Sequence, residues 1–196
     1  MKKFKSEKRL IKITNTLKRR QYDLMVVLEN IHDPHNVSAI FRTCDAVGIP
    51  KVSLVYTIEK FPKIGKKSSA SAFKWVERQK FTSIDSCYSE LRKNGFKIFA
   101  SSISNDSKSI YDIDFTGKVA IVLGNEHRGV SEQAEKSADE RIMIPMFGMV
   151  QSLNVSVAAA IILYEAARQR IGKGKYDKPQ LNHSELEKLI ELWCSK

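Results

Sequence analysis

The chain has 196 residues, of which 42% are hydrophobic and 9% aromatic, and its formal net charge at pH 7 is +11. This length fits one globular domain, and the hydrophobic content excludes the class of intrinsically disordered proteins. The longest apolar run, at residues 157–164, is too short to span a bilayer, and no apolar signal-peptide core follows the charged first residues, so we expect a cytoplasmic protein without a membrane segment.

The positive charge is concentrated in the first twenty residues. Residues 1–20 contain nine lysines and arginines and one glutamate, which gives this segment a charge of +8 and leaves +3 for the other 176 residues. Residues 6–20 are predicted to form a basic helical extension. It lacks a bulky apolar face, so a nucleic-acid partner is favoured over a solubilising tail or a membrane-surface helix. Its candidate RNA contacts are Lys8, Arg9, Lys12, Arg19 and Arg20.

A strand and a capped helix follow the basic extension. The short apolar run at residues 24–28 predicts a buried strand. Asp33 and Pro34 then provide the N-cap and the first residue of a helix over 34–47. Apolar residues recur at helical spacing along one face of this helix, and Arg42 projects away from that face. Arg42 is therefore expected to be available for a ligand.

Strands and helices alternate through the rest of the chain. Further strands are predicted at residues 52–56, 76–81, 96–100, 119–123 and 141–144, and further helices at 83–94, 131–138, 154–170 and 184–193. This order, with strands that are apolar throughout, predicts an α/β fold around a mainly parallel sheet flanked by helices. We expect a domain at 21–171 between the extension at 1–20 and a linker with a C-terminal helix at 172–196.

Ligands bind outside the carboxyl ends of parallel strands, so the loops after the strands are the candidate site. Residues 58–75 form a Lys/Gly/Ser-rich segment typical of a functional loop, in which Lys66 and Lys67 are candidate RNA contacts. In the loop LGNEHRG, Gly124 would let backbone groups approach a flat ligand, although no dinucleotide or P-loop fingerprint is present. Glu126 could alternatively be a surface carboxylate that forms an ion pair with a nearby basic residue, either Arg128 or Lys136.

Three polar residues interrupt the apolar segment before the predicted helix at 154–170. They are Gln151, Ser152 and Asn154, and an N-cap role would account for only one of them. No metal site is expected, because His32 and His35 lack a third ligand at a recognisable spacing. The three cysteines, Cys44, Cys87 and Cys194, are too widely spaced to indicate a disulfide framework or a zinc site.

Three segments together resemble the ordered motifs of the SPOUT superfamily of RNA methyltransferases, in the TrmH branch. They are ENIHDPHNVSAIFRTCDAVGI, VAIVLGNEHRGVS and IMIPMFGMVQSLNVSVAAAIILYEAARQR. The resemblance covers about residues 20–171, and the helical flanks are similar as well. It implies a SPOUT fold with a C-terminal deep trefoil knot, S-adenosylmethionine as the methyl donor, and a homodimer in which both chains approach one site.

The resemblance also implies roles for individual residues. The cofactor contacts fall on Ser101, Leu123, Gly124, Ile144, Met146, Ser152 and Leu153. The catalytic positions fall on Arg42, Asn36, Glu126, Ser152 and Asn154. Arg42 would grip an RNA phosphate and help to orient or deprotonate the ribose hydroxyl, because a guanidinium is a poor base in the simple sense; direct base catalysis is the alternative.

The substrate that the resemblance implies is tRNA, with the ribose 2′-hydroxyl of the D-loop guanosine at position 18 as the acceptor. Relatives with the same motifs act on rRNA or on other tRNA riboses, which are the alternatives. Two further classes are an RNA-binding protein without catalysis and a Rossmann-like enzyme acting on a small nucleotide. The complete set of catalytic positions disfavours the first, and the missing glycine fingerprint and the basic extension disfavour the second.

Overall fold

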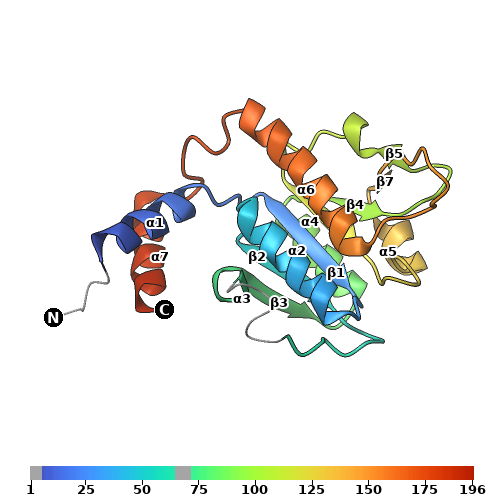
Figure 1. Cartoon of the computed structure of the whole chain (residues 1–196), viewed down its shortest axis with the longest axis horizontal. Helices are drawn as coiled ribbons and strands as arrows, with labels where there is room; N and C mark the ends of the chain where they lie inside the picture. The colour runs from blue at the N-terminus through green and yellow to red at the C-terminus, as the bar shows by residue number, and fades with distance from the viewer. Residues whose placement is uncertain (1–5, 65–71) are drawn as a thin grey trace.

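The computed structural model describes residues 6–64 and 72–196 (Figure 1). Lys66 and Lys67 therefore lie outside the described residues. The helices are α1 (Glu7–Lys18), α2 (Pro34–Ala46), α3 (Ala72–Trp75), α4 (Ile84–Lys93), α5 (Glu132–Ser137), α6 (Val155–Gly172) and α7 (His183–Ser195), with a 3₁₀ turn η1 at Ile110–Asp112. The strands are β1 (Leu24–Glu29), β2 (Lys51–Val55), β3 (Glu77–Phe81), β4 (Lys97–Ser101), β5 (Lys108–Ser109), β6 (Val119–Leu123) and β7 (Glu140–Met143).

The strands form one sheet in the order β3-β2-β1-β6-β4-β7-β5, and every pairing in it is parallel. Strands β1 and β6 lie near its centre, and each of their residues is buried. Helices α2 and α6 pack on one face and α4 and α5 on the other, so both faces are covered (Figure 1). The predicted α/β class with a mainly parallel sheet is confirmed, whereas the knot stays a prediction.

The two edges of the sheet differ from the expectation of uniformly apolar strands. Strand β3 has one neighbouring strand, and its residues are exposed or half-buried, so the expectation was wrong for this strand. Strand β5 at the other edge has two residues and was not predicted. The segment at 58–75 also contains the short helix α3, where a loop was expected. Edge strands carry little apolar signal because much of their surface remains in water.

A buried arginine ties the end of α6 to the start of the sheet. Arg170 has no exposed surface, and its Nε donates to the carbonyl of Phe115 at 3.0 Å. Its two terminal nitrogens donate to the Asp23 carboxylate and to carbonyl groups of Asp23 and Gly117. Lys175 also pairs with Asp23. This cluster fixes α6, the start of β1 and the loop before β6 to one another.

The two ends of the chain pack against each other as a helix pair, α1 with α7 (Figure 1). Ile13 and Leu17 of α1 and Leu186 and Trp193 of α7 form a separate buried cluster. Trp75 joins it, with its ring centroid 4.7 Å from that of Trp193. Neither terminal helix is therefore an independent tail.

Arg20 was expected to contact RNA, and the structure contradicts this. Its side chain is fully buried, with a 2.5 Å ion pair to Asp45 and hydrogen bonds to the carbonyls of Ile49 and Trp75. Its guanidinium also lies 5.2 Å from the centroid of the Trp193 ring. A cation enclosed in this way holds α1 to the domain and has no surface to offer a phosphate.

Within residues 6–64 and 72–196, no helix combines the length and the apolar character needed to cross a membrane.

Candidate active site

A cavity of about 570 Å³ opens at the carboxyl ends of β4, β6 and β7. Its walls come from the loops that follow these strands and from the start of α6. All seven residues expected to contact the cofactor line it: Ser101, Leu123, Gly124, Ile144, Met146, Ser152 and Leu153. Segments that are far apart in the sequence thus meet at one hollow, as expected for loops at the same edge of a parallel sheet.

Gly124 is required for the loop after β6 to close. A Cβ atom at this position would lie 2.1 Å from the backbone of Gly129 and Val130. The loop returns on itself through an antiparallel bridge between Asn125 and Gly129, and Gly129 has a φ of +69°. The close approach of the loop's own backbone is therefore one reason for a glycine at this position, and the expected approach to a ligand stays a prediction.

Glu126 accepts hydrogen bonds from the segment that follows β1. Its Oε2 accepts from the N–H of His32 at 3.0 Å, and its Oε1 accepts from the N–H of Asp33 and from Nδ2 of Asn36, both at 3.0 Å. The alternative, an ion pair of Glu126 with a nearby basic residue, was wrong. Arg128 pairs with Glu59, and Lys136 pairs with Glu132 in its own helix. Glu126 therefore joins the β6 loop to the start of α2.

The network continues from Asn36 into the third motif. Oδ1 of Asn36 accepts a hydrogen bond from Nδ2 of Asn154 at 3.0 Å. Asn154 is the N-cap of α6, and its Oδ1 accepts from the N–H of Ser156 at 2.8 Å. The N-cap role considered for Ser152 or Asn154 therefore belongs to Asn154. Ser152 is exposed on the cavity wall.

The network also sets the charge of Glu126. Burial alone would raise the pKa of this carboxyl, but the hydrogen bonds from Asn36 and from the N–H groups of His32 and Asp33 together hold the pKa below its usual value of 4.5. Glu126 is consequently ionised at neutral pH and acts as an acceptor.

We expect Glu126→Gln to lower the free energy of unfolding by about 1–3 kcal/mol, because an amide presents one acceptor where three donors converge. Since the folded pKa of Glu126 is depressed, its ionised form contributes fully above about pH 4.5 and this contribution is lost as the pH falls through the folded value. Urea unfolding should show a constant difference between the two proteins from about pH 5 to pH 8 that shrinks in more acidic buffer. A difference that persists unchanged in acid would contradict this assignment.

Arg42 lies outside this cavity. It is exposed on α2, as expected, and in the part of the chain that the structure describes its side chain makes no hydrogen bond or ion pair. It is six residues beyond Asn36, which places it about 9 Å further along the helix axis. The structure therefore joins Asn36, Glu126 and Asn154 in one network, and it does not bring Arg42 to the same cavity within one chain.

Asn30, which the sequence analysis missed, fixes the neighbouring loop. It directly follows β1 and has a φ of 50°, a left-handed conformation that asparagine tolerates better than most residues. Its Oδ1 accepts hydrogen bonds from the N–H groups of Thr57, Ile58 and Glu59 at 3.0–3.2 Å, and its carbonyl accepts from Nδ2 of Asn125 at 2.8 Å. The only sequence signal for this role is an asparagine two residues after the apolar run at 24–28.

Glu59 gives the loop after β2 a second attachment. Its carboxylate pairs with Arg128 at 2.8 Å and lies 3.4 Å from Nδ1 of His32. The hydrogen bond from Arg128 is the main cause that lowers the pKa of Glu59. Three loops, after β1, β2 and β6, are thus held together beside the cavity.

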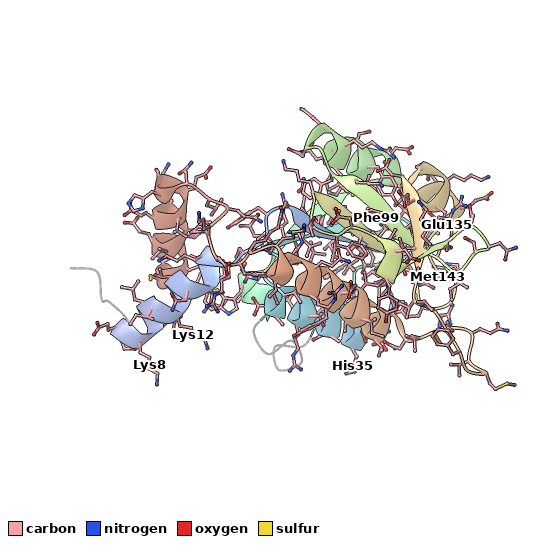
Figure 2. All side chains as sticks on the ribbon, turned by 90° about the horizontal axis from the view of Figure 1, so that it is seen from above. Lys8, Lys12, His35, Phe99, Glu135 and Met143 are labelled. Atoms are coloured by element: carbon pink, nitrogen blue, oxygen red, sulfur yellow. The ribbon has the colours of Figure 1, made fainter. Side chains whose placement is uncertain are left out.

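The remaining candidate RNA contacts lie on α1, away from the cavity. Lys8 and Lys12 point outward from this helix in Figure 2, and both are exposed, as is Arg19. Arg9 is half-buried. In the described residues, no group of three histidine, cysteine or acidic side chains is arranged to hold a metal ion.

Known proteins resemble the chain over most of its length. The model of the SpoU rRNA Methylase family matches residues 23–164. The chain is 43% identical over 192 residues to tRNA (guanosine(18)-2′-O)-methyltransferase of Thermus thermophilus, with 98% of each chain covered. It is 40% identical to the enzyme of the same name from Escherichia coli, covering 93% of this chain and 80% of that one.

Solved structures agree with these likenesses. The TrmH/SpoU tRNA modifying enzyme of Aquifex aeolicus superposes with a TM-score of 0.90 at 42% identity, with 96% of each chain covered. The SpoU methyltransferase AviRb of Streptomyces viridochromogenes, solved in complex with S-adenosylmethionine, has a TM-score of 0.70 at 25% identity and covers 80% of this chain and 61% of its own. The second and third motifs line one cavity, and hydrogen bonds of Asn36 join the first motif to them. The chain belongs to the SpoU family of S-adenosylmethionine-dependent methyltransferases.

Proposed function

We propose that this chain transfers a methyl group from S-adenosylmethionine to the 2′-hydroxyl of a tRNA ribose, that of the D-loop guanosine at position 18. The observation that carries this proposal is the likeness to a tRNA (guanosine(18)-2′-O)-methyltransferase over 98% of both chains. This likeness includes the terminal helices α1 and α7, which lie outside the family match at residues 23–164. A protein with a tRNA substrate would act in the cytoplasm, which is the location we propose.

The cavity at β4, β6 and β7 fits S-adenosylmethionine in size and chemistry. Its volume of about 570 Å³ lies within the range of small-molecule sites. Leu123, Ile144, Met146 and Leu153 provide apolar walls for an adenine ring, and the loop backbones provide donors and acceptors for its edge. When bound, the cofactor supplies a methyl group on a sulfonium, which a ribose oxygen can displace.

The residues of the network act by holding these loops. Glu126 and Asn36 fix the loop after β6 to the start of α2, and Asn154 fixes the start of α6. Ser152 stands on the cavity wall next to this cap. A displacement reaction requires the attacking oxygen and the methyl carbon to be aligned, so a rigid wall is a direct contribution to the rate.

We further propose that the active unit is a homodimer and that Arg42 serves the cavity of the partner subunit. Phe147 and Met149, in the loop before α6, are 97% and 99% exposed. Val157 and Tyr164 continue this apolar surface along α6. A second copy would remove these side chains from water, and it would bring an exposed Arg42 to a site that it does not reach within its own chain.

The direct test is to incubate purified protein with total tRNA and labelled methyl donor and to map the methylated riboses. Methylation at guanosine 18 is the expected result. Methylation of rRNA or of another tRNA ribose would replace the proposed substrate while retaining the chemistry. Cofactor at about 100 times its dissociation constant should stabilise the protein by about 2.7 kcal/mol, and the absence of any thermal stabilisation or binding heat would contradict the cofactor site.

The basic residues on α1 should set the salt dependence of tRNA binding. Removing residues 1–20 would also expose Leu186 and Trp193 of α7, so charge substitutions are the cleaner test. For Lys8→Gln with Lys12→Gln, we expect the slope of log affinity against log salt to fall by about 0.7–0.9 for each lost phosphate contact, with cofactor affinity unchanged. An unaltered slope would assign these lysines to solubility.

A further inference from the structure

A second cavity, of about 380 Å³, lies toward the amino ends of the strands, whereas the cofactor cavity lies at their carboxyl ends. Lys51 and Glu77 open β2 and β3, and Lys118 precedes β6, so this cavity is at the amino ends of the strands. Its lining continues along β3 to Phe81, but it includes none of the loops after β4, β6 and β7 that enclose the cofactor cavity. Among the residues that the structure describes, none lines both cavities.

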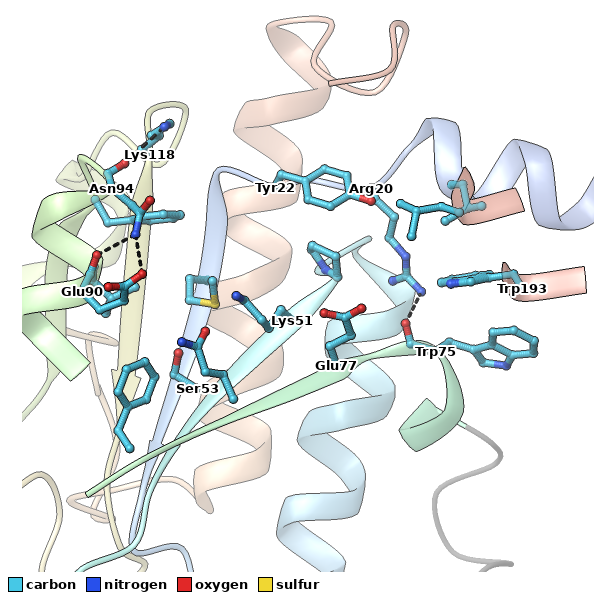
Figure 3. Close-up of a pocket in the computed structure, with 18 of the residues that line it drawn as sticks. Arg20, Tyr22, Lys51, Ser53, Trp75, Glu77, Glu90, Asn94, Lys118 and Trp193 are labelled. Carbon is cyan, nitrogen blue, oxygen red and sulfur yellow. Dashed lines mark hydrogen bonds between the residues drawn. The ribbon is translucent and has the colours of Figure 1, made fainter. Parts of the chain in front are cut away.

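This second cavity lies where the terminal helices meet the sheet. Leu17 of α1 and Leu189, Trp193 and Lys196 at the end of the chain form one wall, and Trp75 of α3 continues it. The strands β2 and β3 and the helix α4 form much of the rest, together with residues such as Met25 of β1 (Figure 3). The cavity therefore lies against the helix pair that includes the basic helix α1.

The walls of this cavity are rich in aromatic rings and cations. Five of its lining residues are aromatic: Tyr22, Trp75, Phe81, Phe96 and Trp193. Besides the enclosed Arg20, three lining residues are cationic and two are anionic: Lys51, Lys118 and Lys196 against Glu77 and Glu90. Aromatic faces interleaved with cations are the combination that binds unpaired nucleotides, because the rings stack on bases and the cations attract phosphates.

Several polar side chains in this cavity have hydrogen-bonding capacity to spare. Lys51, Ser53 and Glu77 come from the adjacent strands β2 and β3 and lie near one another at the centre of Figure 3. In the part of the chain that the structure describes, the side chains of Lys51, Glu77 and Gln79 have no hydrogen bond or ion pair. An aromatic pocket with a few convergent polar groups is the usual form of a site for a small planar ligand.

We propose that this cavity binds one unpaired nucleotide of the tRNA substrate, at a distance from the methylated ribose. This inference rests on the proposed function, which supplies the RNA. The Lys51 ammonium is the group for the phosphate, and the Glu77 carboxylate accepts from an amino group on the base edge. A base with an exocyclic amino group, as in guanosine, adenosine or cytidine, therefore fits better than uridine, which has only a ring N–H to donate.

The chain provides its own reporters for this site, because its two tryptophans, Trp75 and Trp193, both line the cavity. We expect the indole N–H signals of full-length protein to shift in nuclear magnetic resonance spectra on titration with guanosine monophosphate, and to shift less with uridine monophosphate. S-adenosylmethionine should leave them unchanged. Indole signals that respond to neither nucleotide would overturn the proposal, as would equal responses to both.

The matched pair of variants is Lys51→Glu and Lys93→Glu. Both replace a lysine by glutamate near the same edge of the sheet, but Lys93 is exposed on α4 and does not line the cavity. Lys51→Glu should weaken tRNA binding by about tenfold and abolish the indole shifts, and Lys93→Glu should change the affinity by less than about twofold. Thermal unfolding and cofactor calorimetry should be the same for both.

The outcomes separate this inference from the proposed function. If the wild-type protein methylates tRNA and the two variants bind it equally well, the nucleotide site is wrong and the function stands. If the wild-type protein neither binds nor methylates tRNA, the proposed function is wrong. Loss of tRNA affinity in Lys51→Glu alone, with cofactor binding intact, supports the site.

Discussion

Arg42→Ala should lower the rate of methyl transfer to tRNA by roughly 100- to 1,000-fold under single-turnover conditions. This is the range for removing one donor that stabilises charge in a transition state. The fold should be spared, because Arg42 is exposed and, within the described residues, its side chain has no hydrogen bond or ion pair. Cofactor affinity should also be unchanged, because Arg42 does not line the cofactor cavity of its own chain, and its proposed contact at the partner's cavity is with an RNA phosphate.

Arg42→Lys separates two roles for the guanidinium. Lysine retains the positive charge but lacks the planar group with several donors. Substantial recovery of the rate would indicate that neutralising a phosphate is sufficient, and little recovery would indicate that donor geometry is required. Lys93→Ala, a change to an exposed residue on α4, is the control. Normal turnover in both Arg42 variants would mean that another group handles the hydroxyl proton.

Arg170→Ala should lower the free energy of unfolding by about 3–5 kcal/mol, because it breaks a buried ion pair and leaves several carbonyls without a donor. For a chain of this length, that loss corresponds to a fall in melting temperature of roughly 6–20 °C. Thermal and urea unfolding measure it. The large effect follows from the complete burial of Arg170 and from the hydrogen bonds made by all three of its nitrogens.

Arg168→Ala is the matched control, on the same helix two residues earlier. The Arg168 side chain is 72% exposed, and its partner Glu165 keeps a hydrogen bond from Gln169. A surface ion pair of this kind contributes about 1 kcal/mol or less. If the two variants unfolded alike, the cluster around Asp23 would not be the element that holds α6 to the sheet.

Local signals in the sequence predicted the central part of the fold. Asp33 is the N-cap of α2, and its side chain accepts from the N–H of His35, as the Asp-Pro pair indicates. The apolar runs of β1 and β6 are buried on both sides, as expected for a parallel sheet. These features depend on neighbouring residues, so a sequence pattern contains them.

The features that were missed depend on contacts between distant segments. Arg20 directly follows the exposed Arg19 in the sequence, and no local pattern distinguishes the two. Arg20 is nevertheless buried, because Asp45 and Trp193 enclose it. Asn30 anchors a loop some 27 residues further along the chain. In the site, the motifs identified Glu126, Asn36 and Asn154, but the hydrogen bonds that join them required coordinates.

The pairing of α1 with α7 has a consequence for the nascent chain during translation. Ribosomes make the N-terminal end first, so Ile13 and Leu17 emerge long before Leu186 and Trp193, against which they pack. Helix α1 must therefore remain unpartnered while nearly all of the polypeptide is translated. A chain truncated before α7 would leave this apolar face in water, where chaperones and proteases act on it. The face is buried against its partner helix only once α7 has been translated.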